Sequence, residues 1–195
     1  LGVNDKVSQL FAKTSGLNKR DFMLNAAEGK CPVCNGKGKI LLEDEVEDVC
    51  PNCEGRMFSD AVLEKEYHGL NILDFLQTPV NQLIPLVAED KKIGKIFSLC
   101  EQIGVGYLSL SRTSRTLSKG EIQRIKLVNV LSSAEKGNIY VLDEPSKGLH
   151  PSDINKLVNI ISEIIKCGNT VIAVEHNVDF ISRCNYAIEF GPSSG

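Results

Sequence analysis

The sequence predicts an α/β fold in which helices flank a parallel sheet and a small four-cysteine zinc ribbon is attached. Two apolar runs, 139–142 and 170–174, predict strands. The segment between them carries apolar residues at helical spacing. Strand, helix and strand in this order are typical of a parallel sheet. Upstream, two C-x2-C pairs are typical of a zinc ribbon.

The first apolar run ends in two adjacent carboxylates. Ile139 to Leu142 predict a strand that is buried on both faces of a parallel sheet. Asp143 and Glu144 follow at its carboxyl end, which is where ligands bind in open α/β sheets. Pro145 has no N–H to donate and is expected to end the strand. The alternative is a solvated Asp-Glu turn after an ordinary core strand.

The second run ends close to a histidine. Thr170 to Val174 predict a second buried strand, and His176 follows it. We expect His176 to lie beside the two carboxylates if the strands are neighbours. Pro151 is expected to begin the intervening helix, and Gly168 to end it. A lone histidine is more often a structural residue, and that alternative stays open.

A helix start is predicted before the first strand. Ser118 and Glu121 have the spacing of a capping box, and the apolar residues that follow predict an amphipathic helix. A helix N-terminus with a serine hydroxyl, and with Gly120 for close backbone approach, suits an anion.

The net charge of −3 and the pI near 5.7 do not favour a globally basic nucleic-acid binder. No stretch approaches the roughly 18 consecutive apolar residues of a membrane span, and no charged-then-apolar leader is present. We therefore expect a cytoplasmic protein without a membrane partner.

Two cysteine pairs predict a structural zinc site. Cys31 and Cys34 are separated by 15 residues from Cys50 and Cys53, which is close to the usual spacing of a zinc ribbon. Four thiolates fill a tetrahedral site and leave no open position for catalysis. Disulfides are the alternative, and a reducing compartment disfavours them. The remaining cysteines are expected in the core: Cys100, Cys167 and Cys184.

Three motifs in a fixed order resemble the second half of an ABC-type ATPase cassette. They are Leu117–Glu121, Ile139–Pro145 and Thr170–His176. The resemblance implies an ATPase in which two cassettes face each other around the nucleotide. The usual Leu-Ser-Gly-Gly-Glu signature is Leu-Ser-Lys-Gly-Glu here, so Lys119 adds bulk and charge where the backbone should pass closely.

The cassette resemblance also implies a role for each motif residue. Asp143 would help hold Mg²⁺, and Glu144 would polarise the water that attacks the γ-phosphate of ATP. His176 would sense that phosphate. The signature residues implied to bind the nucleotide of the partner cassette are Ser118, Gly120 and Glu121.

Further stretches narrow the resemblance to the UvrA family, the damage-recognition ATPase subunits of UvrABC excinucleases. They include the segment 31–38, which contains the first C-x2-C motif and is called the knuckle below, Gly148-Leu149-His150 and Glu175-His176-Asn177. The resemblance covers essentially the whole chain. The Gly-Leu-His triplet is the more specific signal, since most ABC proteins carry Leu-Asp there. The resemblance implies nucleotide excision repair by a homodimer that inspects damaged double-stranded DNA and loads a UvrB-like subunit.

Two departures from the family pattern affect this prediction. Lys119 and a short zinc loop favour a divergent paralogue, such as a UvrA-like protein that protects against DNA-targeting antibiotics. No G-x4-G-K-[ST] phosphate loop occurs in the chain. In the family this loop lies upstream of the zinc ribbon. We therefore expect the downstream part of a cassette, inactive alone, with ATP and Mg²⁺ bound by the intact protein.

Four segments are expected along the chain. They are an N-terminal helical segment of the signature region (1–28), the zinc ribbon (29–60), the helical signature region (61–135) and the α/β core (136–195). Two other classes remain as alternatives. The knuckle 31–38 also matches the C-x-x-C-x-G-x-G unit of J-type chaperones, although only a partial second copy follows. A transporter-type ATPase is disfavoured by the Gly-Leu-His triplet and by the ribbon.

Overall fold

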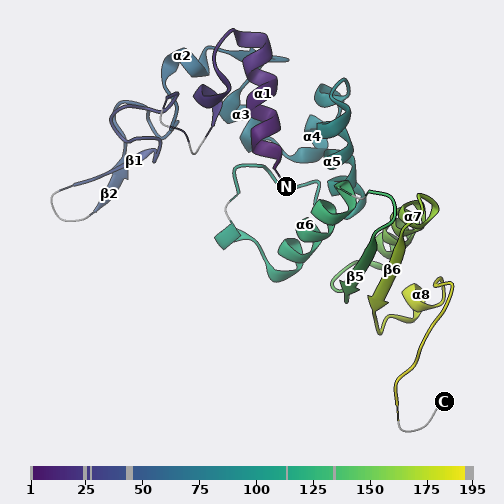
Figure 1. Cartoon of the computed structure of the whole chain (residues 1–195). Helices are drawn as coiled ribbons and strands as arrows, with labels where there is room; N and C mark the ends of the chain where they lie inside the picture. Colours follow the sequence, from purple (N-terminus) through teal and green to yellow (C-terminus); the bar gives the residue numbers. More distant parts are fainter. Residues whose placement is uncertain are drawn as a thin grey trace. The chain divides into compact units, whose positions relative to one another are not determined.

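The computed structural model describes residues 2–23, 26, 28–42, 46–112, 114–133 and 135–191. The chain divides into two compact units. Figure 1 colours the chain along its sequence and labels its helices and strands. Unit 1 comprises Leu1–Gly94 and Leu108–Arg112, and unit 2 comprises Lys95–Tyr107 and Thr113–Gly195. The cysteines of the two C-x2-C motifs lie in unit 1, whereas the residues predicted to bind the nucleotide lie in unit 2. The four-segment division stays a prediction.

Unit 1 is built around an aromatic core. Phe11 on α1 packs against Phe22 and Phe75, with ring centroids 5.4 and 5.5 Å apart, respectively. Tyr67 completes the cluster at 5.9 Å from Phe11. The elements around this core are α1 (Val3–Ser15), η1 (Lys19–Phe22), α2 (Asp60–Leu63), β3 (Glu66–Tyr67), β4 (Leu70–Asn71), α3 (Ile72–Gln77), α4 (Val80–Leu83) and η2 (Pro85–Val87).

A small ribbon also belongs to unit 1. Strands β1 (Lys39–Leu41) and β2 (Glu47–Val49) pair antiparallel, with Lys39 opposite Val49. An isolated bridge between Lys30 and Phe58 joins the two ends of the ribbon segment. The four cysteines of the two C-x2-C motifs form a buried cluster of their own, and Ile40 of β1 packs against it.

Unit 2 contains the predicted strand, helix and strand. β5 (Ile139–Asp143) and β6 (Thr170–Val174) pair in parallel, with Asp143 opposite Val174, and Figure 1 draws their arrows pointing the same way. The helix between them begins at Pro151, as predicted. The helices of this unit are the end of α5 (Lys91–Gln102), η3 (Ser114–Thr116), α6 (Lys119–Ser132), α7 (Pro151–Lys166) and α8 (Val178–Ile181).

The predicted burial of both sheet faces is wrong. Leu142 on one face is 9% exposed, whereas Val141 and Ile172 on the other are 70% and 53% exposed. Helix α7 contacts β6 and buries Ile154, Leu157, Ile161 and Ile164. Successive side chains of a strand point to opposite faces. Since α7 covers one face, the outward residues of the two described strands remain exposed.

Three cysteines outside the C-x2-C motifs are expected in the core. This prediction is right for Cys100, which is buried, and wrong for Cys167 and Cys184, which are exposed. Cys167 is the C-cap of α7 and lies beyond the apolar stripe of that helix. Cys184 follows the short helix α8. Within the described ranges, no helix has the length and apolar character needed to cross a bilayer.

Candidate nucleotide site and metal centre

Glu144 and His176 lie beside each other at one edge of the parallel sheet. Because β5 and β6 run in parallel and in register, their carboxyl ends meet at this edge. The Nδ1 atom of His176 is 3.4 Å from Oε1 of Glu144. Asp143 is the last residue of β5, immediately before Glu144. The structure thus brings together the three residues predicted at the strand ends, while their roles stay predictions.

The backbone at Glu144 is held in an uncommon conformation. Its φ is 43°, in the left-handed region that residues other than glycine seldom adopt. The N–H of Glu144 donates to the carbonyl of Val174 at 2.9 Å. From α6, Gln123 Nε2 donates to the carbonyls of Asp143 and Glu144 at 3.2 and 2.9 Å. These bonds fix the turn after β5. Such conformations persist where the surroundings over-determine them, frequently at functional sites.

Lys147, which is not among the predicted site residues, contacts the candidate catalytic carboxylate. Lys147 Nζ donates to Oε2 of Glu144, and Lys147 N–H donates to the Glu144 carbonyl at 3.0 Å. The hydrogen bond to the carboxylate, together with its negative charge, raises the pKa of Lys147. One feature of the sequence does indicate this contact. Lys147 follows Glu144 by three residues, and a turn brings residues at that separation close together.

Glu175 joins the two loops of the site. Its side chain is 2% exposed. It accepts hydrogen bonds from the N–H groups of Ser146 at 2.7 Å, His176 at 2.9 Å and Asn177 at 3.1 Å. Burial favours the neutral acid, but these hydrogen bonds outweigh it and lower the pKa of Glu175. Glu175 belongs to the Glu-His-Asn motif that carries the family resemblance, but the motif alone does not predict this structural role.

The start of α6 forms the predicted capping box. Ser118 Oγ accepts from the N–H of Glu121 at 3.2 Å, and Glu121 Oε2 accepts from the N–H of Ser118 at 2.6 Å. Oε1 of Glu121 accepts from the hydroxyl of Tyr107 at 2.6 Å. The carboxylate of Glu121 is therefore engaged in fixing the helix start. Its predicted contact with a nucleotide stays a prediction.

Gly120 has no packing role within unit 2. A Cβ added there would meet nothing within 4 Å, and its φ is not among the positive values. Ser118 and Lys119 beside it are exposed. The N-terminal turn of α6 therefore presents backbone N–H groups to an open surface. That arrangement suits an anion or another molecule that approaches closely.

The four cysteines of the two C-x2-C motifs form a buried cluster with the geometry of a metal site. All four Sγ atoms lie within 4.8 Å of one another, and all four residues are buried. Cys31 and Cys50 Sγ are 3.9 Å apart, and Cys34 and Cys53 Sγ are 3.6 Å apart. Zn–S bonds of about 2.3 Å in a tetrahedron place sulfur atoms about 3.8 Å apart. The donor set thus fits a structural zinc ion.

Neighbouring groups donate hydrogen bonds to these sulfurs. Gly38 N–H donates to Cys34 Sγ, and Asn52 Nδ2 donates to Cys31 Sγ, each at 3.2 Å. Burial raises the pKa of Cys31, but hydrogen bonds from backbone N–H groups and Asn52 outweigh it and lower that pKa to about 6. Burial, with hydrogen bonds among the thiols, raises the pKa of Cys53 to about 11. A bound cation would be needed to hold Cys53 as a thiolate at neutral pH.

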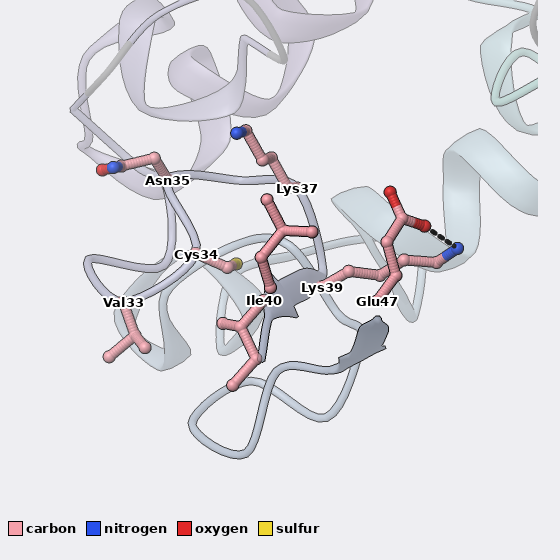
Figure 2. A pocket seen from close by; sticks show the side chains of 8 residues that line it. Val33, Cys34, Asn35, Lys37, Lys39, Ile40 and Glu47 are labelled. Carbon is pink, nitrogen blue, oxygen red and sulfur yellow. Dashed lines mark hydrogen bonds and ion pairs between the residues drawn. The ribbon is translucent and has the colours of Figure 1, made fainter. Parts of the chain in front are cut away.

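A shallow hollow of about 440 Å³ lies beside this cluster. Figure 2 shows its lining side chains and the ion pair of Lys39 with Glu47, whose Nζ and Oε2 atoms are 2.9 Å apart. The lining residues are Val33, Cys34, Asn35, Lys37, Lys39, Ile40, Leu41 and Glu47. Lys39 and Glu47 are largely exposed, so this hollow is part of the open ribbon surface.

Comparison with known proteins gives matches over the whole chain. The chain is 36% identical over 204 aligned residues to UvrABC system protein A of Lactiplantibacillus plantarum, covering 100% of this chain and 22% of the relative. For UvrABC system protein A of Staphylococcus aureus the identity is 35%, with the same coverage. UvrA2 from Deinococcus radiodurans superposes with a TM-score of 0.76 and 37% identity, covering 93% of this chain and 24% of that one. No family model matches.

The chain thus spans about a fifth of the length of the curated relatives it matches. The match to UvrA2 agrees with the predicted α/β fold. The paralogue, chaperone and transporter alternatives stay predictions.

Proposed function

Because the chain belongs to the UvrA family, we propose that it is the downstream part of an ATP-hydrolysing cassette in a nucleotide excision repair protein. The observation that carries the proposal is the 3.4 Å approach of His176 Nδ1 to Glu144 Oε1 at the carboxyl ends of two parallel strands. A carboxylate and an imidazole at this edge can face one bound phosphate group.

Each residue at the strand ends has a distinct proposed role. Asp143 is exposed and offers carboxylate oxygens, the donors that Mg²⁺ prefers. Bound there, Mg²⁺ would neutralise charge on the phosphates of ATP. Glu144 accepts a hydrogen bond from the attacking water and orients it toward the γ-phosphate. His176 donates a hydrogen bond to that phosphate, so it responds to the presence of ATP. Glu175 and Gln123 hold these groups in place.

The second half of the proposed site comes from another cassette. Ser118 and Gly120 are accessible at the N-terminal turn of α6, which suits contact with a nucleotide held by a partner molecule. We therefore propose an ATP-dependent homodimer. In the intact protein this cycle would be coupled to inspection of damaged double-stranded DNA and to loading of a UvrB-like subunit. A zinc ion held by the four cysteines would stabilise the ribbon and take no part in hydrolysis.

A Glu144→Gln variant of the full-length protein tests the proposal. The amide keeps the size of the side chain but cannot polarise water as a carboxylate does. We expect ATP turnover to fall by about a hundredfold or more, while ATP-dependent dimerisation persists. Glu163→Gln on α7 is the matched control, because Glu163 is an exposed glutamate that pairs with Lys166. Hydrolysis at the normal rate in Glu144→Gln would refute the assignment of Glu144.

A further inference from the structure

Lys147 places an ammonium group at the site, and the proposed function gives this group no role. It lies in the turn after β5, and its N–H donates to the Glu144 carbonyl at 3.0 Å. That bond fixes the backbone of Lys147 close to Glu144, so the long side chain folds back onto the Glu144 carboxylate. The side chain of Lys147 is 62% exposed, which leaves its ammonium able to exchange partners.

Both oxygens of the Glu144 carboxylate have a neighbour in this arrangement. Lys147 Nζ donates to Oε2, and His176 Nδ1 lies 3.4 Å from Oε1. A carboxylate that polarises water must itself accept a hydrogen bond from that water. An ammonium on one oxygen attracts the same electron density that the water needs. The observed contact therefore opposes the proposed role of Glu144.

We propose that Lys147 is a positioning residue that restrains Glu144 also in the ATP-bound protein, and that hydrolysis requires its ammonium to leave the carboxylate. This inference rests on the proposed function of the site. The γ-phosphate that Glu144 and His176 face carries negative charge, and it gives the ammonium a second anionic partner. In the ATP-bound protein the ammonium is therefore shared between the carboxylate and the phosphate, and hydrolysis is slowed whenever the ammonium contacts Glu144.

The exposure of the pair sets the size of the expected effect. Lys147 is 62% and Glu144 32% exposed, so their attraction is moderated by solvent and by salt. Pairs of this kind correspond to about a twofold to fivefold change in an equilibrium. We therefore expect Lys147→Met, which keeps the chain length and removes the charge, to raise kcat for ATP about twofold to fivefold with little change in KM.

The dependence of kcat on salt distinguishes an electrostatic restraint by Lys147 from an effect of its side-chain packing. Turnover is measured in the full-length protein without DNA, at saturating ATP and at increasing ionic strength. Wild-type kcat should rise toward that of Lys147→Met as salt screens the ion pair, whereas the variant should show no such rise. Lys147→Arg keeps a cation within reach of Glu144 and should behave like wild type.

Lys166→Met is the matched control. Lys166 also forms an exposed pair with a glutamate three residues away, with its Nζ 2.7 Å from Oε1 of Glu163, but on α7. It should keep wild-type kcat and salt response. Equal or lower kcat in Lys147→Met would overturn the restraint. If Glu144→Gln retains turnover, the proposed function itself fails. If Glu144→Gln is inactive while Lys147→Met matches wild type, only the role of Lys147 fails.

Discussion

The carboxylate of Glu175 accepts a hydrogen bond from the backbone N–H of Ser146 at 2.7 Å, so a residue that follows β6 holds the loop that follows β5. The same carboxylate accepts from the N–H of His176. The loops that carry Glu144 and His176 are therefore joined through one buried side chain. Displacement of either loop would disturb both candidate catalytic groups.

Removal of this carboxylate should loosen both loops. In Glu175→Ala, three backbone N–H groups lose their acceptor, and the one at the buried Ser146 destabilises the local structure by about 1–3 kcal/mol when it is left without a partner. We expect faster amide hydrogen exchange at Ser146, His176 and Asn177 and a lower kcat for ATP. Exchange in the zinc ribbon should not change. Unchanged exchange at Ser146 would contradict the role of Glu175.

The stabilisation that Glu175 provides should depend on pH. Its pKa is lower in the folded protein than the ordinary value of about 4.3. A group with a lowered folded pKa contributes its full stabilisation above the unfolded pKa and loses it as pH falls through the folded value. The unfolding midpoint of wild type should therefore exceed that of Glu175→Gln at pH 7. A constant difference down to pH 2 would refute this linkage.

The cysteine cluster should bind one zinc ion per chain. Cys34→Ser removes one of the four ligands and should abolish stoichiometric zinc in metal analysis, with unfolding of the ribbon. Cys184→Ser changes an exposed cysteine outside the cluster and should retain zinc. Since protons compete with the metal for thiolates, zinc affinity should fall as pH is lowered. A full zinc content in Cys34→Ser would argue against the four-cysteine site.

Two glycine substitutions should differ in their effect on stability. Gly120→Ala adds a Cβ that meets nothing within 4 Å in a helix, so it should keep or raise the melting temperature and lower the ATP turnover of the dimer. Gly38→Ala places a Cβ 2.9 Å from the carbonyl oxygen of Gly55 at a φ of +72°, so it should destabilise the ribbon. Normal turnover in Gly120→Ala would indicate that no partner approaches this turn closely.

Local patterns predicted much of the fold. The capping box at Ser118, both strands of the parallel pair and the cysteine cluster depend on neighbouring residues or on fixed spacings, and the structure contains all of them. The burial of the sheet could not be predicted in the same way. An apolar strand has the same sequence whether one face or both are covered, and Val141 is exposed because α7 covers only the other face.

The supporting residues of the site were harder to predict than the residues they support. Asp143, Glu144 and His176 occur in short motifs, so the sequence singles them out. Lys147 and Glu175 act through contacts formed only when the two loops fold together. Because cysteine is usually buried, residue type alone predicts Cys167 in the core. Its position at the end of α7 decides its exposure instead.

The exposed side of the β5–β6 sheet affects how the chain behaves when it is produced by itself. Ile139, Val141, Ile172 and Val174 form a water-facing apolar strip, each more than half exposed. Such a strip next to strand edges promotes self-association. Recombinant preparations of this segment alone should therefore tend to aggregate, and solubility trials should begin with lysine substitutions on that strip.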